Sequence, residues 1–336
     1  MNNSIFYTQK YELCTMKVFW ILSFFILGTA KIFAQTGGES VYTFLKLPVC
    51  SNSAAMGGAT IASGNLGANN IFSNAAMIDT LNDRYAALNY ADYIADINFG
   101  TAAYCAKIDT LWSVAGGVQF MNYGSFDYAD EAGVLGGTFT AKDHAIYVAG
   151  IRQITKRLRA SVTLKTIFSH LETYKSWGMA FDLGLAYNIE EQGIVIGATV
   201  RNLGWQCRPY TGGHREPLPL DIQLGASKML LHAPLRFSLT CTNLQSRLDS
   251  SFMTNVADHL VFGVELFPKS VVSAKAGFNV LRHNDLSVSG ATPFAGFSIG
   301  ADVRLRRFAV QYSRVCYGAA ASINMFTAEL FLREFR

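Results

Sequence analysis

Carboxylate and histidine side chains are the residues of this sequence that could most readily do chemistry. Asp127, Asp130 and Glu131 stand close together in the segment DYADE. Carboxylates so near one another could bind calcium or act in acid–base catalysis. Their spacing is not that of an EF-hand loop, and acidic residues in a long loop are commonly just solvated. We therefore predict no metal site here, while calcium binding by this loop stays open as an alternative.

No other motif indicates catalysis. The six histidines are spread along the chain without a paired-histidine motif, and no serine stands in a nucleophile-elbow pattern. The six cysteines form no close pair, so neither a disulfide framework nor a zinc site is expected. A dyad of residues far apart in sequence stays open. We expect a non-catalytic protein with no cofactor.

Composition and the N-terminus indicate an exported membrane protein. Half of the residues are hydrophobic and 15% are charged, against about 25% charged residues in soluble domains. The net charge of +4 does not suggest a nucleic-acid binder. Residues 1–34 have the layout of a signal peptide, with Lys17, an apolar run from Val18 to Leu27 and a cut after Ala34. Residues 1–15 look like an upstream mis-start, and a membrane-anchoring helix is the alternative.

From about Arg84 onward, apolar and polar residues alternate with the period of a β-strand. In FDLGLAYN, Phe181, Leu183 and Leu185 share one face, while Asp182 and Gly184 share the other. The alternation predicts fourteen strands, near 84–93, 97–106, 111–121, 143–151, 158–168, 177–187, 194–202, 218–229, 235–243, 259–267, 271–280, 293–303, 308–316 and 322–332. The stretch VLGGTFTA at 134–141 could extend one of them.

Strand length and connection length together favour a barrel in the outer membrane of a Gram-negative bacterium. Tilted strands of about 9–11 residues cross a bilayer, and short turns that alternate with longer loops are typical of outer-membrane barrels. We therefore predict an all-β fold, with residues 84–336 forming a transmembrane barrel of about fourteen antiparallel strands. An even strand number places both chain ends in the periplasm. A soluble β-sandwich or propeller is the alternative, because its strands would alternate too.

The face opposite the apolar one is small and polar, which predicts a polar lumen. It carries Ser161, Thr163, Lys165, Thr199, Arg201, Gln223, Glu265 and Lys275. Residues 35–83, by contrast, are rich in Gly, Ala, Ser and Asn and have low strand propensity, as in SAAMGGATIASGNLGANN (53–70). Small residues can fold as compact turns where bulky side chains do not fit. We predict that this segment is a hatch inside the barrel.

Several blocks of the sequence resemble one family of outer-membrane barrels. ESVYTFLKLPVCSNSAAMGGATIA is similar to an N-terminal hatch, and the REPLP block at 215–219 is the most specific match. The chain thus resembles the PorQ family of the type IX secretion system, within the wider group of PorV and long-chain fatty-acid transporters. The resemblance assigns the hatch turn to Gly57, Gly58, Ala59 and Asn74. Where the wider group tends to have Asn-Pro-Ala, this chain has SNAAM without a proline.

The resemblance implies a non-catalytic role in protein secretion. The protein would anchor a PorZ-like partner at the cell surface, in the complex that attaches secreted cargo to lipopolysaccharide. Outer-membrane lipid and further attachment-complex subunits would be its other partners, and nucleic acid would not. Trp, Tyr and Arg are common interface anchors, so the expected docking residues in the 203–217 loop are Trp205, Arg208, Tyr210, His214 and Arg215. Alternatively these are ordinary rim and girdle residues.

Two other functions stay open at this point. The wider group and the hatch suggest a transporter of hydrophobic solutes, although a polar lumen counts against an apolar path. An outer-membrane enzyme such as a lipase would need a serine or histidine constellation at a strand end, and no such pattern is readable here.

Overall fold

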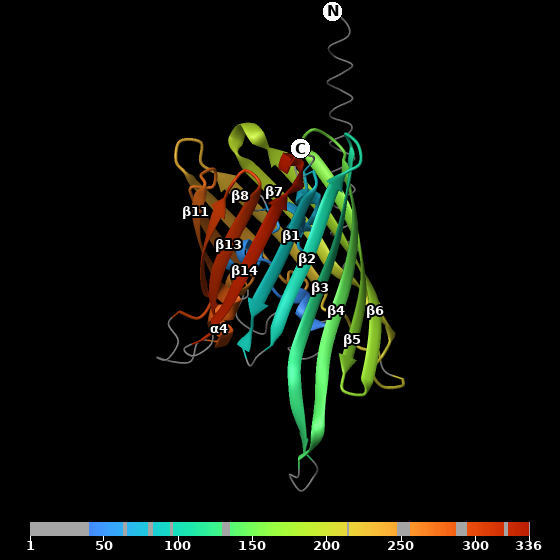
Figure 1. Ribbon diagram of the computed structural model, residues 1–336. Coiled ribbons are helices and arrows are strands. Elements are labelled where there is room, and N and C mark those ends of the chain that lie inside the picture. The colour runs from blue at the N-terminus through green and yellow to red at the C-terminus, as the bar shows by residue number, and fades with distance from the viewer. Residues whose placement is uncertain are drawn as a thin grey trace, which may run out of the picture.

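The chain forms a closed barrel of fourteen antiparallel strands (Figure 1). The computed structural model describes residues 40–62, 66–79, 83–94, 97–129, 135–213, 215–246, 256–286, 294–318 and 322–335. The predicted signal peptide lies outside these ranges. Among the helices of the described ranges, none combines the length and apolar character needed to cross a bilayer.

Each strand pairs with its neighbours in sequence, and β1 pairs with β14 to close the ring. The strands are β1 (Tyr85–Asp92), β2 (Asn98–Lys107), β3 (Trp112–Ala129), β4 (Leu135–Gln153), β5 (Leu158–Leu171), β6 (Tyr174–Ile189), β7 (Ile194–Arg208), β8 (Asp221–Met229), β9 (Leu235–Cys241), β10 (Leu260–Leu266), β11 (Val272–Asn279), β12 (Phe297–Arg304), β13 (Phe308–Cys316) and β14 (Ser322–Phe331). The predicted strand number and closure are confirmed.

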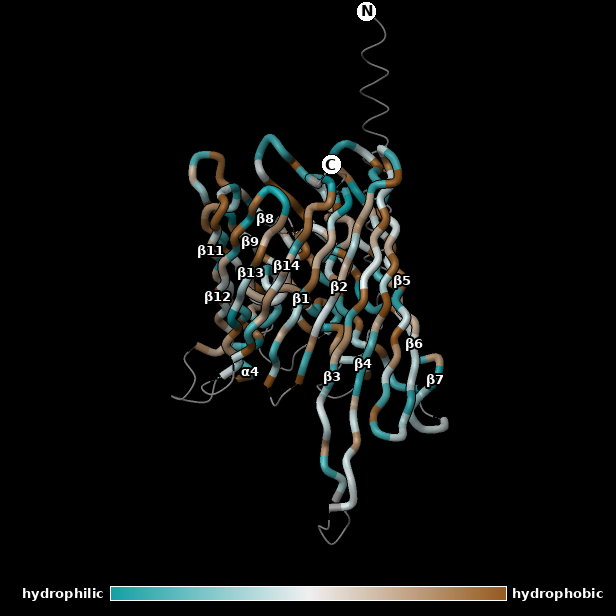
Figure 2. Tube along the Cα trace, viewed as in Figure 1, coloured by the Kyte–Doolittle hydropathy of each residue, from teal (hydrophilic) through white to brown (hydrophobic). Residues whose placement is uncertain are grey.

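The two faces of the strands differ in the way that a barrel in lipid requires. Along β13, Val310 is 51% exposed and Tyr312 is 40% exposed, whereas Ser313 on the opposite face is fully buried. The same alternation of exposed apolar and buried small residues runs through the other strands, and it gives the barrel wall its mixed colouring in Figure 2. The apolar side chains therefore point outward and the small and polar ones inward, as predicted.

The ends of the barrel differ as well. The turns at 154–157, 190–193 and 305–307 are short, and β1 begins beside the end of β14 at the same rim, where Tyr85 is opposite Phe331. At the other rim most connections are longer, although a two-residue turn at 172–173 joins β5 to β6. This asymmetry is that of an outer-membrane barrel, with the short turns on the periplasmic side.

Two of the predicted connections are structured. The segment between the predicted strands 111–121 and 143–151 is largely a two-stranded ribbon, because β3 and β4 stay paired beyond the end of the other strands (Figure 1). A register shift between Asn122 and Ser125 bends the ribbon where Gly124 has a φ of +87°. The predicted connection 281–292 overlaps a short helix, α4 (Val280–Leu286).

Residues 40–62 and 66–79, here called the inner segment, lie within the barrel. Their helices are η1 (Thr43–Lys46), α2 (Ser51–Ala55), η2 (Gly67–Phe72) and η3 (Ala75–Met77). The helix α2 packs on β11 to β14, η2 on β1 to β4, and η3 on β4 to β6. Because these strands come from opposite sides of the ring, the inner segment occupies the lumen (Figure 1, blue).

Glycines on the inner wall make room for the inner segment. A Cβ placed on Gly277 of β11 would lie 2.2 Å from the Gly57 nitrogen and 2.7 Å from the Ala55 oxygen. A Cβ on Gly184 of β6 would lie 2.3 Å from Asn74 Oδ1. Contacts this short are not tolerated, so Gly277 lets the backbones of β11 and the inner segment approach, and Gly184 makes room for the Asn74 side chain. The small residues of the inner segment and of the wall fit one another.

Valine at Gly277 should therefore displace the inner segment from β11. Overpacking of this kind costs about 1–3 kcal/mol, which should appear as a lower free energy of unfolding in urea and as faster proteolysis near Gly57. The matched control is Gly116→Val, because Gly116 faces outward with no atom within 4 Å of its Cβ position. Equal proteolysis of the two variants would show that Gly277 does not contact the segment.

Candidate functional site in the barrel lumen

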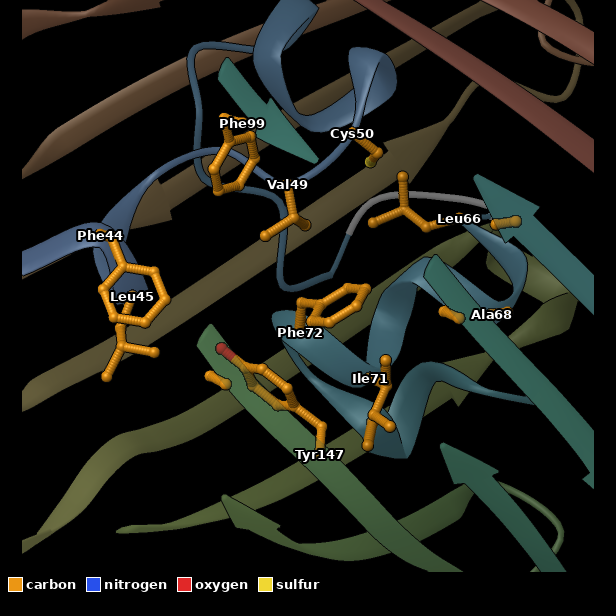
Figure 3. Close-up of a cluster of buried hydrophobic side chains, with 14 of the residues drawn as sticks. Phe44, Leu45, Val49, Cys50, Leu66, Ala68, Ile71, Phe72, Phe99 and Tyr147 are labelled. Atoms are coloured by element: carbon orange, nitrogen blue, oxygen red, sulfur yellow. The ribbon is translucent and has the colours of Figure 1, made fainter. Parts of the chain in front are cut away.

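One half of the lumen is apolar. Between the inner segment and strands β1 to β5 lies a cluster of buried side chains (Figure 3). Phe72 of η2 packs edge-on against Tyr147 of β4, with ring centroids 4.9 Å apart. Phe44, Ile71 and Phe99 belong to the same cluster. We call this interface the apolar seam.

Two polar side chains of the wall, Tyr147 and Gln119, are hydrogen-bonded at the apolar seam. The Tyr147 hydroxyl donates to Gln119 Oε1 at 2.6 Å, and Gln119 Nε2 donates to the Phe44 carbonyl at 2.8 Å. On the wall, alanines face inward beside these groups, among them Ala87, Ala103 and Ala145. Large apolar side chains of the inner segment thus pack against small side chains of the wall.

The other half of the lumen carries buried ion pairs. Lys165 of β5 lies 2.7 Å from Asp182 of β6, and its ammonium also donates to Asn202 Oδ1 at 2.6 Å. Arg201 of β7 is 3.9 Å from Asp221 of β8 and donates to the Leu45 carbonyl of the inner segment at 3.0 Å.

A longer series of ion pairs crosses β9 to β12. Arg236 lies 2.7 Å from Glu265, Lys275 lies 3.6 Å from Glu265, and Lys275 also pairs with Asp302. Charges inside a protein must be compensated, because an uncompensated buried charge costs several kcal/mol. The wall of β5 to β12 is therefore polar, and its charges are paired across strands.

The prediction of a polar lumen holds only for this second half. Every residue of the predicted polar face lies on β5 to β11 and is buried. The apolar half on β1 to β4 was missed, although alternating alanines in YAALNYAD and FGTAAYCAK were its signal. An inward-facing alanine can lie against apolar or polar neighbours. Only the packed inner segment therefore shows that this surface is apolar.

The predicted hatch-turn residues occupy two separate places. Gly57 and Gly58 follow α2 with φ angles of +90° and +94°, and the Gly57 N–H donates to Ser298 Oγ of β12 at 3.1 Å. Ala59 follows them and is half-buried. Asn74 lies beside β6 instead. Its Nδ2 donates to the carbonyls of Ile61 and Leu185, and its Oδ1 accepts from the Ala76 N–H.

The predicted docking residues do not form one surface. The strand β7 runs through Arg208, so the prediction that a loop starts at residue 203 is wrong. Trp205 points outward from that strand and is 53% exposed, while Arg208 ends it. Tyr210 turns inward: its hydroxyl lies 2.5 Å from Ser169 Oγ and its ring packs near Tyr42 of the inner segment.

Burial raises the pKa of Tyr210 above its ordinary value, so its phenol stays protonated. Arg215 is exposed, and His214 lies outside the described residues. Asp127 is exposed on the β3–β4 ribbon, whereas Asp130 and Glu131 lie outside the described residues. Within the described part of the chain no group of three His, Cys, Asp or Glu side chains is arranged to hold a metal ion.

Solved structures share this architecture. The CymD monoaromatic hydrocarbon channel aligns with a TM-score of 0.55 and 12% identity, over 85% of this chain and 97% of that one. The Pseudomonas putida toluene transporter TodX aligns with a TM-score of 0.50 and 12% identity, over 89% and 98%. A Pseudomonas aeruginosa FadL homologue gives 0.50 and 11%, over 84% and 97%.

These comparisons establish the class of protein. Neither a family model nor a curated protein matches the amino-acid sequence. At 11–12% identity the structural likeness shows the fold, which is that of an outer-membrane β-barrel similar to FadL homologues and hydrocarbon channels. That fold agrees with the wider group named from the sequence. The narrower resemblance to PorQ has no support from a matching sequence family.

Asn74 should be the polar residue that matters most for the position of η3. Asn74→Ala removes two hydrogen bonds to carbonyls and one cap, and each such bond contributes about 1 kcal/mol. We expect the free energy of unfolding to fall by about 2 kcal/mol. Asn74→Asp keeps the Oδ1 acceptor for Ala76 but sets a buried carboxylate oxygen against the two carbonyls, so it should be destabilised at least as much as Asn74→Ala. Parent-like stability of Asn74→Ala would refute this assignment.

Proposed function

We propose that this barrel carries hydrophobic solutes across the outer membrane and that the inner segment gates it. The apolar seam is the observation that carries the proposal, because it is an apolar surface running inside a barrel wall. The similarity in fold to CymD, TodX and a FadL homologue supports it. An apolar solute gains about 25 cal/mol for each Å² of apolar surface that it buries there.

The two ends of the inner segment are held by different forces. At α2, the Ser51 N–H donates to Thr327 Oγ1 at 2.9 Å, and the Ser51 hydroxyl donates to the Met325 carbonyl at 2.8 Å. At η2, the contacts with β3 and β4 are largely apolar, through Ile71 and Phe72. Apolar contacts are not directional, so a solute can replace them. The gate therefore opens at η2 while α2 stays anchored.

Two engineered disulfides test which end moves. In a variant without the native cysteines, Ile71→Cys with Gly117→Cys would lock η2 to β3. Ile71 Cγ2 lies 3.2 Å from the Cβ position of residue 117, a separation that a disulfide can bridge. We expect oxidation to reduce uptake of oleate or toluene into proteoliposomes at least tenfold, and a reductant to restore it.

The matched control locks the other end. Ser51→Cys with Thr327→Cys would link α2 to β14, where the two hydroxyl oxygens are 3.1 Å apart. Oxidation of this pair should leave uptake within twofold. Undiminished uptake by the oxidised Ile71–Gly117 variant would overturn the gate, and parent protein that takes up neither solute above empty vesicles would overturn transport itself.

A second candidate function is the anchoring of a surface partner, for which the β3–β4 ribbon is the specific observation. The ribbon projects beyond the barrel, past the pairing of β2 at Asn122 and of β5 at Ala141. Phe126 and Phe139 stack on it with ring centroids 5.3 Å apart, and Tyr128 is 51% exposed. Exposed aromatic side chains on a paired strand suit a protein contact.

Affinity purification from detergent-solubilised outer membrane tests this candidate. A partner bound through the ribbon should be lost from Phe126→Ser with Tyr128→Ser and retained by Tyr174→Ser, which changes an equally exposed tyrosine at the next hairpin. Purification of the parent barrel without any surface protein, or equal retention by both variants, would count against anchoring.

A further inference from the structure

Five basic side chains lie together on the outward face of β4 to β7, at the rim opposite the turns at 154–157 and 190–193. They are Lys142 and His144 of β4, His170 of β5, Lys175 of β6 and Arg208 at the end of β7, and we call them the basic rim patch. All five are exposed, whereas their chain neighbours Asp143, Ser169 and Ser176 face inward and are buried.

Strand register places these groups in direct contact range. Lys142 is opposite His170, and His170 is opposite Lys175. One row closer to the barrel's middle, His144 is opposite Phe168, and Phe168 is opposite Trp177, which is opposite Arg208. Directly opposed side chains have Cβ atoms about 4.5–5.5 Å apart. The seven residues line a shallow cavity of about 300 Å³.

No acidic side chain in the described ranges neutralises the positive charges of the basic rim patch. Among the described residues, none of its lysine or arginine side chains has a carboxylate within ion-pair distance, and no carboxylate lines the cavity. Inside the barrel the opposite holds, since Lys165, Arg236 and Lys275 each contact an acidic side chain. Like charges that face one another across strands are destabilising. An external anion would remove that cost.

The position of the basic rim patch in the barrel wall indicates which kind of anion can reach it. Directly below it on β4 are Ile146 and Val148, which are 48% and 59% exposed and belong to the lipid-facing surface. Trp177 and Phe168 lie within the patch, as aromatic residues do at a membrane interface. The patch thus begins where the apolar belt ends, at the depth of lipid headgroups in the outer leaflet.

We propose that the basic rim patch binds the phosphate groups of a phosphorylated glycolipid of the outer leaflet. Arg208 can hold a phosphate in bidentate fashion, and the two lysines act as point charges. The imidazole nitrogens of His144 and His170 can donate further hydrogen bonds. Phe168 and Trp177 offer apolar contact to the sugar and the first acyl carbons. This proposal is independent of solute transport, so either can fail alone.

Native mass spectrometry of the refolded mature chain in a zwitterionic detergent tests the proposal. Three probes are compared: lipid A with two phosphates, the same lipid with both phosphates removed, and inorganic phosphate. We expect binding of the first probe only, weakening as salt concentration rises. Lys142→Gln, Lys175→Gln and Arg208→Gln together should weaken its binding at least tenfold.

A matched control removes the same charge elsewhere on the outer surface. Lys228, Lys269 and Arg314 are exposed and lie outside the patch, and their combined change to Gln should alter binding less than twofold. Lys142→Arg with Lys175→Arg should bind like the parent. The faster migration of unboiled samples in electrophoresis checks that every variant is folded.

Three results would overturn the proposal. Equal binding by the folded patch variant and the parent would show that these cations do not touch the lipid. Equal binding of the phosphate-free lipid would assign the contact to acyl chains. Saturation by millimolar inorganic phosphate, with competition against the lipid, would make the patch a site for the free ion.

Discussion

Backbone hydrogen bonding in lipid is the constraint on which this structure depends. A bilayer offers no partner to a free N–H or C=O group, so a sheet that crosses it must close. Here the closure is the pairing of the first and last strands, from Tyr85 opposite Phe331 to Asp92 opposite Asn324. Once the ring is closed, every second side chain must face lipid and the others must face a confined interior. The composition of the chain follows from that division.

A closed ring of this size leaves an interior that has to be filled or hydrated. The inner segment fills it, and Gly57 and Gly277 mark a place where its backbone approaches that of the wall. The lumen is then divided by chemistry. Buried ion pairs on β5 to β12 compensate one another, while β1 to β4 meet the inner segment through largely apolar contacts, with a few hydrogen bonds such as that from Asn89 to Asn69. Because of that asymmetry, an apolar solute can replace the contacts on one side of the inner segment.

The sequence predicted the wall better than what lies inside it or extends from it. Most strand ends fall within a few residues of prediction because period-2 alternation is imposed by the bilayer itself. The ribbon of β3 and β4 was predicted only in part, because beyond the membrane both its faces are exposed and alternation ceases to be required. The apolar seam was not predicted, because inward-facing alanines do not by themselves indicate an apolar surface. The packing of Phe72 against Tyr147 shows it. The basic rim patch depends on register between strands, which no single stretch of sequence contains.

The orientation of the side chains in the wall is the central claim, and spin labels on β4 test it most directly. Single cysteines at Ile146 and Val148 should give labels that collide with oxygen but not with a water-soluble nickel chelate in lipid vesicles. Labels at Ala145 and Ala149 should be protected from both reagents, because these positions face the inner segment and are almost fully buried. A nickel chelate that reaches positions 146 and 148, or oxygen accessibility without a period of two, would contradict the account.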